Sequence, residues 1–251
     1  MTRYFIFLRY KGTNYHGWQI QPNSITIQEV VDQKLSILLR QKIETTGAGR
    51  TDTGVHATQF AAHFDCKDDI LTTKEDFIYK MNCLLPIDIS VYNIRKVNPG
   101  AHARFDAISR TYEYRIAQEK NPFLTEYAYV FANSLDIDLM NKAASSLKHF
   151  NDFTSFSKLH TDVKTNNCNI VEAKWSRNDN LLIFTITADR FLRNMVRAIV
   201  GTLIDIGKGK LSLENFEKII ESKSRNEAGM SAPAHGLYLT KIIYPVTIFG
   251  D

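Results

Sequence analysis

A chain of 251 residues can form one large domain or two domains of about 100–140 residues each. Its 44% hydrophobic and 23% charged residues exclude a disordered protein, and no stretch is apolar and long enough to cross a bilayer. The N-terminus is too charged for a signal peptide, so we expect a cytoplasmic protein without a membrane partner. Cys66, Cys83 and Cys168 are too few and too widely spaced for a disulfide framework or a zinc site.

Patterns of apolar, β-branched and aromatic residues predict strands and helices in alternation. The strands are expected at residues 3–10, 43–48, 58–65, 89–97, 109–117, 170–177, 181–188 and 237–244. The helices are expected at residues 26–40, 74–84, 136–148, 191–206 and 213–222. The order strand, helix, strand, strand, helix, strand occurs approximately twice, which is typical of ferredoxin-like units.

We therefore expect a mixed α/β (α+β) fold of two ferredoxin-like, RNP-like halves, residues 1–107 and 108–251. Their mainly antiparallel sheets would run on into one eight-stranded sheet flanked by helices, with a basic cleft at the centre. The net charge of +4 is modest, but basic residues concentrate within residues 95–115 and 189–210. Such patches suit an anionic partner such as a nucleic acid.

Residues 47–57, with the sequence GAGRTDTGVHA, carry the strongest sign of chemistry. Their glycines permit positive φ angles and close approach of a ligand. Arg50 precedes Asp52 by two positions, and His56 follows it by four. Because cations near a carboxylate favour its ionised form, Asp52 is the candidate catalytic carboxylate and Arg50 belongs to the same candidate site.

Two other interpretations of Asp52 are open. The Asp-Thr-Gly sequence commonly forms a turn in which the aspartate bonds its own backbone and Arg50 is a solvated cation. It is also the signature of aspartic proteases, in which two such carboxylates share a proton. This chain has a single copy, and Arg50 and Thr51 precede it in place of apolar strand residues. A protease is therefore disfavoured.

Residues 109–115, SRTYEYR, combine aromatic and arginine side chains. Alternation along a strand would put Tyr112 and Tyr114 on one face and Arg115 on the other. By itself this is an ordinary amphipathic strand. A tyrosine ring can nevertheless cover an unstacked base while guanidinium groups meet phosphates, so the segment also suits RNA.

Residues 190–201, RFLRNMVRAIVG, overlap the helix expected at 191–206, with Phe191 and Met195 on one face and Arg197 beside it. A core helix with a solvated basic side explains this pattern as well as a functional one does. Residues 231–239, SAPAHGLYL, form a loop that enters the last strand. Neither segment is decisive alone.

Together these segments resemble the TruA family of tRNA pseudouridine synthases over nearly the whole chain. Residues 10–19, YKGTNYHGWQ, are similar to that family's YDGxxYxGWQ opening, with Lys11 in place of the usual acidic residue. GRTDTGVHA is similar to the family's GRTDAGVHA, with Thr53 in place of alanine. The segments HARFDA, RTYEYRI, NDFTSF, FLRNMVRAIVG and SAPAHGLYL follow in the family's order.

The resemblance implies an enzyme that isomerises uridine at tRNA positions 38 to 40, in the anticodon stem-loop, without cofactor or metal and as a homodimer. It implies that Asp52 is the essential aspartate, that Tyr112 packs on the target uracil and that Arg197 forms an ion pair with Asp52. Arg50 would help to hold the RNA with its base flipped out. The N-terminal half would then carry the catalytic loop, and the C-terminal half Tyr112 and the Arg197 helix.

A non-catalytic RNA-binding protein is the competing hypothesis from another functional class. The basic patches and aromatic strands would support it equally well. It leaves the loop around Asp52 unexplained.

Overall fold

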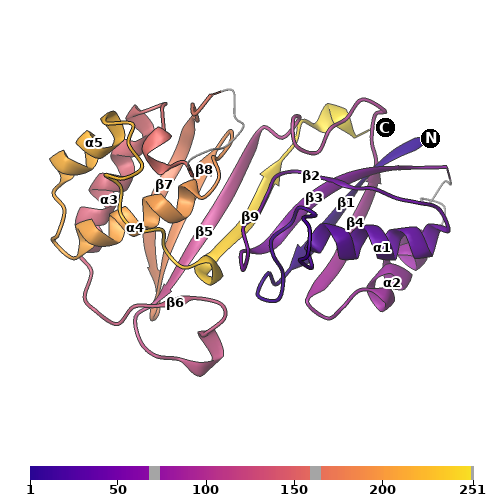
Figure 1. Cartoon of the computed structure of the whole chain (residues 1–251), viewed down its shortest axis with the longest axis horizontal. Coiled ribbons are helices and arrows are strands. Elements are labelled where there is room, and N and C mark those ends of the chain that lie inside the picture. The colour runs from indigo at the N-terminus through magenta and orange to yellow at the C-terminus, as the bar shows by residue number, and fades with distance from the viewer. Residues whose placement is uncertain (68–73, 159–164, 250–251) are drawn as a thin grey trace. The chain divides into compact units, whose positions relative to one another are not determined.

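The computed structural model describes residues 1–67, 74–158 and 165–249 (Figure 1). The chain divides into two compact units, one made of Met1–Ile108 with Leu239–Asp251 and the other of Ser109–Tyr238. The described residues form five α-helices and nine strands. Most of the strand pairs are antiparallel, which confirms the expected mixed α/β class.

The first unit has a sheet with the strand order β4-β1-β3-β9, and the short strand β2 pairs with β3. Strand β1 is antiparallel to both of its neighbours. Helices α1 and α2 lie side by side on this unit (Figure 1). The elements are β1 (Thr2–Tyr10), α1 (Ile27–Leu39), β2 (Thr46–Gly47), β3 (His56–Cys66), α2 (Lys74–Leu84), β4 (Ile89–Lys96), β9 (Leu237–Ile243) and the 3₁₀ turn η5 (Val246–Ile248).

Strand β1 is a nearly continuous apolar run because both of its faces are covered. Tyr4, Ile6 and Leu8 alternate with Phe5 and Phe7, and all five are buried. The C-terminal segment contributes to the cover, since the Phe5 ring meets the ring of Tyr244 at 5.2 Å and that of Phe249 at 6.2 Å. The end of the chain therefore completes the core around its first strand.

Helix α1 begins at a threonine cap, because the Thr26 side chain accepts a hydrogen bond from the Glu29 N–H. Asp32 on its buried side accepts hydrogen bonds from the Thr45 N–H at 3.0 Å and the Thr45 hydroxyl at 2.6 Å. Burial raises the pKa of Asp32 to about 6, against the opposing effect of these two bonds. The pair ties α1 to the chain just before β2.

The second unit has the strand order β5-β8-β7, with β6 parallel to β5. Helices α3, α4 and α5 gather beside β7 and β8 (Figure 1). The elements are β5 (Ser109–Ala117), β6 (Tyr129–Val130), α3 (Ile137–Ser146), β7 (Ile170–Asn178), β8 (Leu181–Ala188), α4 (Met195–Gly207) and α5 (Leu213–Glu221). Four 3₁₀ turns join them, η1 (Pro122–Leu124), η2 (Leu147–His149), η3 (Thr154–Phe156) and η4 (Ala234–Gly236).

Capping residues and apolar faces explain where these helices lie. Asp136 caps α3 by accepting from the Leu139 N–H, and Ser212 caps α5 by accepting from the Asn215 N–H. Helix α4 is buried on nearly all sides, as expected of a central core helix. The second unit is thus built around α4.

Three details differ from the sequence-based expectation. The strand expected at 43–48 is reduced to Thr46–Gly47, and the strand Tyr129–Val130 was not expected. Helix α4 begins at Met195 and not at 191, because Asn194 has a left-handed φ of 66° that cannot continue a helix. Phe191 therefore lies outside the helix whose face it was expected to share.

Candidate active site

Asp52 lies in the connection between β2 and β3, at the first position of a tight turn. The Val55 N–H donates to the Asp52 carbonyl oxygen at 3.1 Å. Gly54, the third residue of the turn, has a φ of 78°, as a type II turn requires. Asp52 is half-buried, between the buried Thr51 and the exposed Thr53. The alternative of a turn is therefore correct for the backbone, and the turn presents the Asp52 side chain at a partly desolvated position.

The two basic neighbours of Asp52 in sequence differ in their surroundings. Arg50 is exposed at the edge of the loop. His56 is buried, and its Nδ1 accepts a hydrogen bond from the Gly12 N–H at 3.0 Å. Because a nitrogen that accepts a hydrogen bond carries no proton, His56 is a neutral acceptor. In this conformation Nδ1 of His56 is used as an acceptor for the Gly12 N–H.

Tyr112 lies on β5, where it pairs in register with Ile186 of β8. Tyr112 and Tyr114 are buried on one face of the strand while Arg115 is half-buried on the other, as the alternation predicts. The Tyr112 ring meets the Phe191 ring edge-on, at 5.0 Å between centroids and 83° between planes. Phe191, although outside the helix, therefore fixes the orientation of Tyr112.

Arg197 lies on the first turn of α4 and is bound to the segment that precedes β9. Its Nε donates to the Ala232 carbonyl oxygen at 2.7 Å, and the Ala232 N–H donates to the Arg197 carbonyl oxygen at 2.9 Å. One turn further along, Gly201 touches the same segment so closely that an added Cβ would lie 1.7 Å from the Met230 carbonyl oxygen. The guanidinium and the loop thus fix one another.

Tyr114 joins this segment to β5. Its hydroxyl donates to the Pro233 carbonyl oxygen at 2.8 Å, and burial raises its pKa, which keeps the hydroxyl protonated as a donor. A Cβ on Gly236 would come within 2.8 Å of the Tyr114 ring. The three motif segments of the second unit, RTYEYRI, FLRNMVRAIVG and SAPAHGLYL, are therefore in contact with one another.

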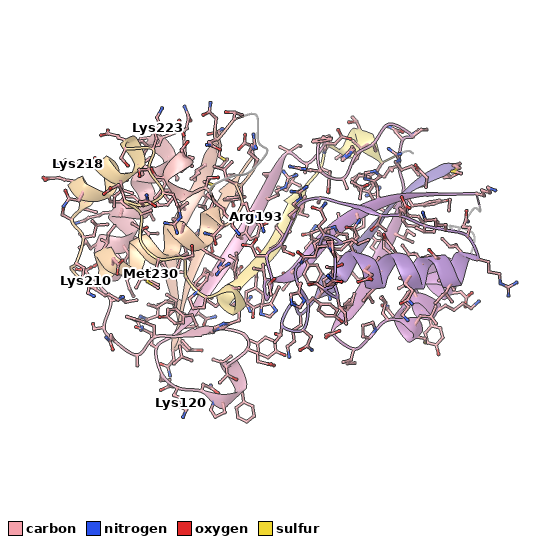
Figure 2. All side chains as sticks on the ribbon, in the orientation of Figure 1. Lys120, Arg193, Lys210, Lys218, Lys223 and Met230 are labelled. Carbon is pink, nitrogen blue, oxygen red and sulfur yellow. The ribbon has the colours of Figure 1, made fainter. Side chains whose placement is uncertain are left out.

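The basic residues of the two predicted patches differ in their burial and in their partners. Arg110 is buried and donates to the Asp189 carbonyl oxygen at 2.8 Å. Arg115 pairs with Glu113 at 3.0 Å and lies 4.0 Å over the Tyr238 ring. Among the remaining cations of the second patch, Arg193 and Lys210 are exposed on the second unit (Figure 2). Some of the predicted patch is therefore structural and some is available to solvent.

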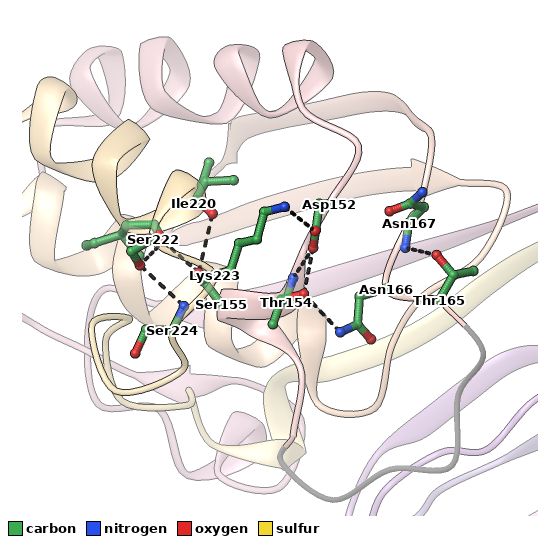
Figure 3. Close-up of polar contacts among 11 residues, drawn as sticks. Asp152, Thr154, Ser155, Thr165, Asn166, Asn167, Ile220, Ser222, Lys223 and Ser224 are labelled. Atoms are coloured by element: carbon green, nitrogen blue, oxygen red, sulfur yellow. Dashed lines mark hydrogen bonds and ion pairs between the residues drawn. The ribbon is translucent and has the colours of Figure 1, made fainter.

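The NDFTSF segment is held by a polar network in the second unit (Figure 3). The Asp152 carboxylate accepts from the N–H and the hydroxyl of Thr154 at 3.0 and 2.6 Å, and Lys223 lies 3.0 Å from it. The hydrogen bond from the Thr154 hydroxyl, followed by that from Lys223, lowers the pKa of Asp152. The Asn166 side chain also donates to the Thr154 hydroxyl oxygen, at 2.9 Å. These contacts give the polar residues of the NDFTSF segment a structural role.

Within the described ranges of the chain, no cluster of three or more His, Cys, Asp or Glu side chains is arranged to hold a metal ion. No helix among those residues is long and apolar enough to span a membrane. Cys66 and Cys168 are buried and Cys83 is exposed, and burial raises the pKa of Cys168 to about 12. The raised pKa disfavours the reactive thiolate, so the Cys168 thiol contributes to packing.

Comparison with known proteins assigns the family. A family model described as tRNA pseudouridine synthase matches residues 143–245. The tRNA pseudouridine synthase A of Bacteroides thetaiotaomicron is 55% identical to this chain, covering 100% of it and 94% of the relative. The chain belongs to the TruA family of tRNA pseudouridine synthases. The enzyme of the same name from Bacteroides fragilis is 56% identical over 99% of both chains, and that of Bacillus subtilis is 39% identical over 94% and 97%.

Family membership confirms the resemblance and makes the chain an isomerase that acts on tRNA. The residue roles stay predictions. Asp52 and Arg50 lie in the first unit and Tyr112 and Arg197 in the second, so the predicted ion pair between Asp52 and Arg197 would join residues of different units. What the sequence did not reveal is the set of contacts around the Asp52 turn, because Tyr10 and Gly12 are remote in sequence and no spacing rule connects them to it.

Proposed function

We propose that this chain converts uridine to pseudouridine at positions 38 to 40 of the tRNA anticodon stem-loop, with Asp52 as the essential carboxylate. The observation that carries the proposal is the turn at residues 52–55, which presents the side chain of the half-buried Asp52 two positions from an exposed arginine. A partly desolvated carboxylate on a fixed backbone is a suitable nucleophile or general base. Close relatives named tRNA pseudouridine synthase A give the reaction class.

The reaction is an isomerisation in which the C1′–N1 glycosidic bond breaks, the uracil rotates and a C1′–C5 bond forms. C5 loses its proton and N1 gains one, so no other reactant is needed. Asp52 can attack C1′, add to C6, or abstract a ribose proton. Each of these three routes uses the ionised carboxylate.

The other site residues would bind the flipped base and pair with the negative charge of Asp52. Tyr112, oriented by Phe191, would pack on the flipped uracil and offset part of the few kcal/mol lost on unstacking. Arg197, oriented by Ala232, would form an ion pair with Asp52. Arg50, exposed beside the turn, would contact the RNA and help to keep the base flipped out.

We further propose that the enzyme works in the cytoplasm as a homodimer whose two subunits contact one tRNA. Exposed cations such as Arg193 and Lys210 suit phosphate contacts, which contribute much of the affinity of proteins for RNA. Size-exclusion chromatography with light scattering, with and without tRNA, measures the stoichiometry.

Release of tritium from C5-labelled uridine in tRNA tests the assignment directly. We expect Asp52→Ala and Asp52→Asn to lose at least about 10³-fold in rate while tRNA binding stays within several-fold, since phosphate contacts are retained. Asp179→Asn, at an exposed turn aspartate, is the matched control. Comparable turnover in the Asp52 variants would refute the role.

Substituted tRNAs test the position. Replacing the uridines at positions 38 to 40 with cytidine should abolish release from an otherwise unchanged tRNA. Continued release would place the reaction elsewhere on the molecule. If the unmodified protein binds tRNA but releases no tritium from any substrate, the non-catalytic RNA-binding alternative is correct.

A further inference from the structure

Residues 10–18 run alongside the Asp52 turn and bind it through side chains at both of its ends. The Tyr10 hydroxyl and the Thr51 hydroxyl are 2.9 Å apart, at the residue just before Asp52. The Gly12 N–H donates to Nδ1 of His56 at 3.0 Å, just after the turn. Tyr10, Thr51 and His56 are all buried, so these bonds are shielded from water. We call residues 10–18 the brace.

Backbone hydrogen bonds add two further points of attachment. The Trp18 N–H donates to the Thr51 carbonyl oxygen at 3.2 Å, and the Gly54 N–H donates to the Tyr15 carbonyl oxygen at 3.4 Å. The turn is thus held at residues 51, 54 and 56, on both sides of Asp52. Its backbone cannot shift without breaking contacts to the brace.

Glycines let the two segments approach this closely. A Cβ on Gly12 would lie 2.0 Å from the Val55 carbonyl oxygen, and one on Gly17 would lie 2.2 Å from the Thr51 carbonyl oxygen. Gly17 also has a φ of 82°, which other residues adopt only with strain. At both positions the brace therefore packs against the backbone of residues 51–55 too closely for any side chain.

The brace is itself anchored to the chain just before β4. The Lys11 N–H donates to the Asp88 carbonyl oxygen at 2.9 Å, and the Tyr15 hydroxyl donates to Oδ1 of Asp88 at 2.5 Å. The Asn14 side chain donates to the other carboxylate oxygen at 3.3 Å. Because Asp88 fixes the brace in this way, the brace can in turn restrain the Asp52 turn.

We propose that Tyr10 and His56 are positioning residues that act through the backbone of the turn to aim the Asp52 carboxylate. The proposal rests on the catalytic role of Asp52. A displacement of about 1 Å at a reacting group can cost about 10²-fold in rate, so a small relaxation of this turn is enough to be measured. Neither residue has to touch the substrate for this effect.

Removal of the buried hydroxyl pair is the first test. We expect Tyr10→Phe and Thr51→Val each to lower kcat for tritium release by about 10-fold or more, with KM for tRNA within about 2-fold. The double variant should be no slower than the worse single variant, because both lose the same bond. Tyr244→Phe is the matched control, since its hydroxyl donates to the Ala103 carbonyl oxygen in the same unit.

Rescue at His56 is the second test. His56→Asn offers a side-chain oxygen close to the position of Nδ1 and should keep most of kcat, whereas His56→Ala should lose it. If the alanine variant does not fold, the asparagine variant and a His56→Leu variant, compared at equal folded fraction by circular dichroism, give the same comparison. Equal losses for asparagine and leucine would overturn the positioning role of His56.

The outcomes separate this proposal from the function on which it rests. Full activity of Asp52→Asn would refute the catalytic assignment. If Asp52→Asn is inactive but Tyr10→Phe and Thr51→Val match Tyr244→Phe in both kcat and melting temperature, the brace has no positioning role. A fall in melting temperature alone, at unchanged kcat, refutes it in the same way.

Discussion

Arg197 and Ala232 exchange two hydrogen bonds, one from the Arg197 Nε to the Ala232 carbonyl and one from the Ala232 N–H to the Arg197 carbonyl. A guanidinium with one edge fixed in this way has a defined direction. The proposed ion-pairing role of Arg197 and its contact with Ala232 therefore depend on the same planar group.

Arg197→Lys should separate charge from geometry. Lysine keeps a cation but loses the Nε donor and the planar fork, so we expect tritium release to fall by about 10²-fold and the melting temperature to fall by a few degrees. Arg225→Lys is the control, because Arg225 also binds this segment, at Gly229 and Ser231. Equal rate losses in both variants would mean that Arg197 only anchors the segment.

Tyr112 should depend on its ring more than on its hydroxyl. If the ring packs on the uracil, Tyr112→Phe should stay within about 5-fold of the unmodified rate, while Tyr112→Leu should lose about 10–100-fold, as expected for a stacking contact of about 1–3 kcal/mol. Single-turnover rates of tritium release measure both variants. A phenylalanine variant as slow as leucine would show that the hydroxyl transfers the proton.

Gly201 should tolerate no side chain. Gly201→Ala would put a Cβ 1.7 Å from the Met230 carbonyl oxygen and should destabilise the protein by about 1–3 kcal/mol, or about 2–10 °C in melting temperature. Gly100→Ala is the control, since a Cβ there meets no atom within 4 Å. Thermal unfolding followed by circular dichroism compares them, and equal melting temperatures would contradict the close contact.

Asp32 should make the protein less stable as pH rises. Its pKa is raised from 3.8 to about 6 in the fold, so the folded state favours the protonated form, and the stability it contributes below pH 4 is lost as pH rises through 6. Asp32→Asn keeps an oxygen acceptor for Thr45 and should gain at most about 3 kcal/mol at pH 8 relative to pH 4. Urea unfolding at both pH values measures this, and an identical pH slope in Asp179→Asn and Asp32→Asn would exclude the effect.

Helices α1 and α5 could be predicted because each has a capping residue and an apolar face, with Thr26 before α1 and Ser212 before α5. The long strands could be predicted from their runs or alternation of apolar residues. The predictions were wrong where one backbone angle sets the end of an element, or where an element has too few residues to show a pattern. The left-handed Asn194 shortens α4 by four residues from the expected start, and β6 has only two residues to show a pattern.

Motif residues in the candidate site were predictable by resemblance, but the contacts that fix them were not. Nothing in the sequence pairs Tyr10 with Thr51, or Arg197 with Ala232, because each pair is 35 or more positions apart. His56 shows the same difficulty, since its type suggested a cation and its buried bond to Gly12 makes it an acceptor.

The packing of Phe5 against Tyr244 and Phe249 has a consequence for biosynthesis. A ribosome that adds about 5–20 residues per second delivers the first strand many seconds before the residues that cover it. All of Ser109–Tyr238 is made in the interval and can fold as a compact unit. The unit that carries Asp52 is therefore begun before the second unit and completed after it, and a chain released before residue 239 would lack an intact core around β1.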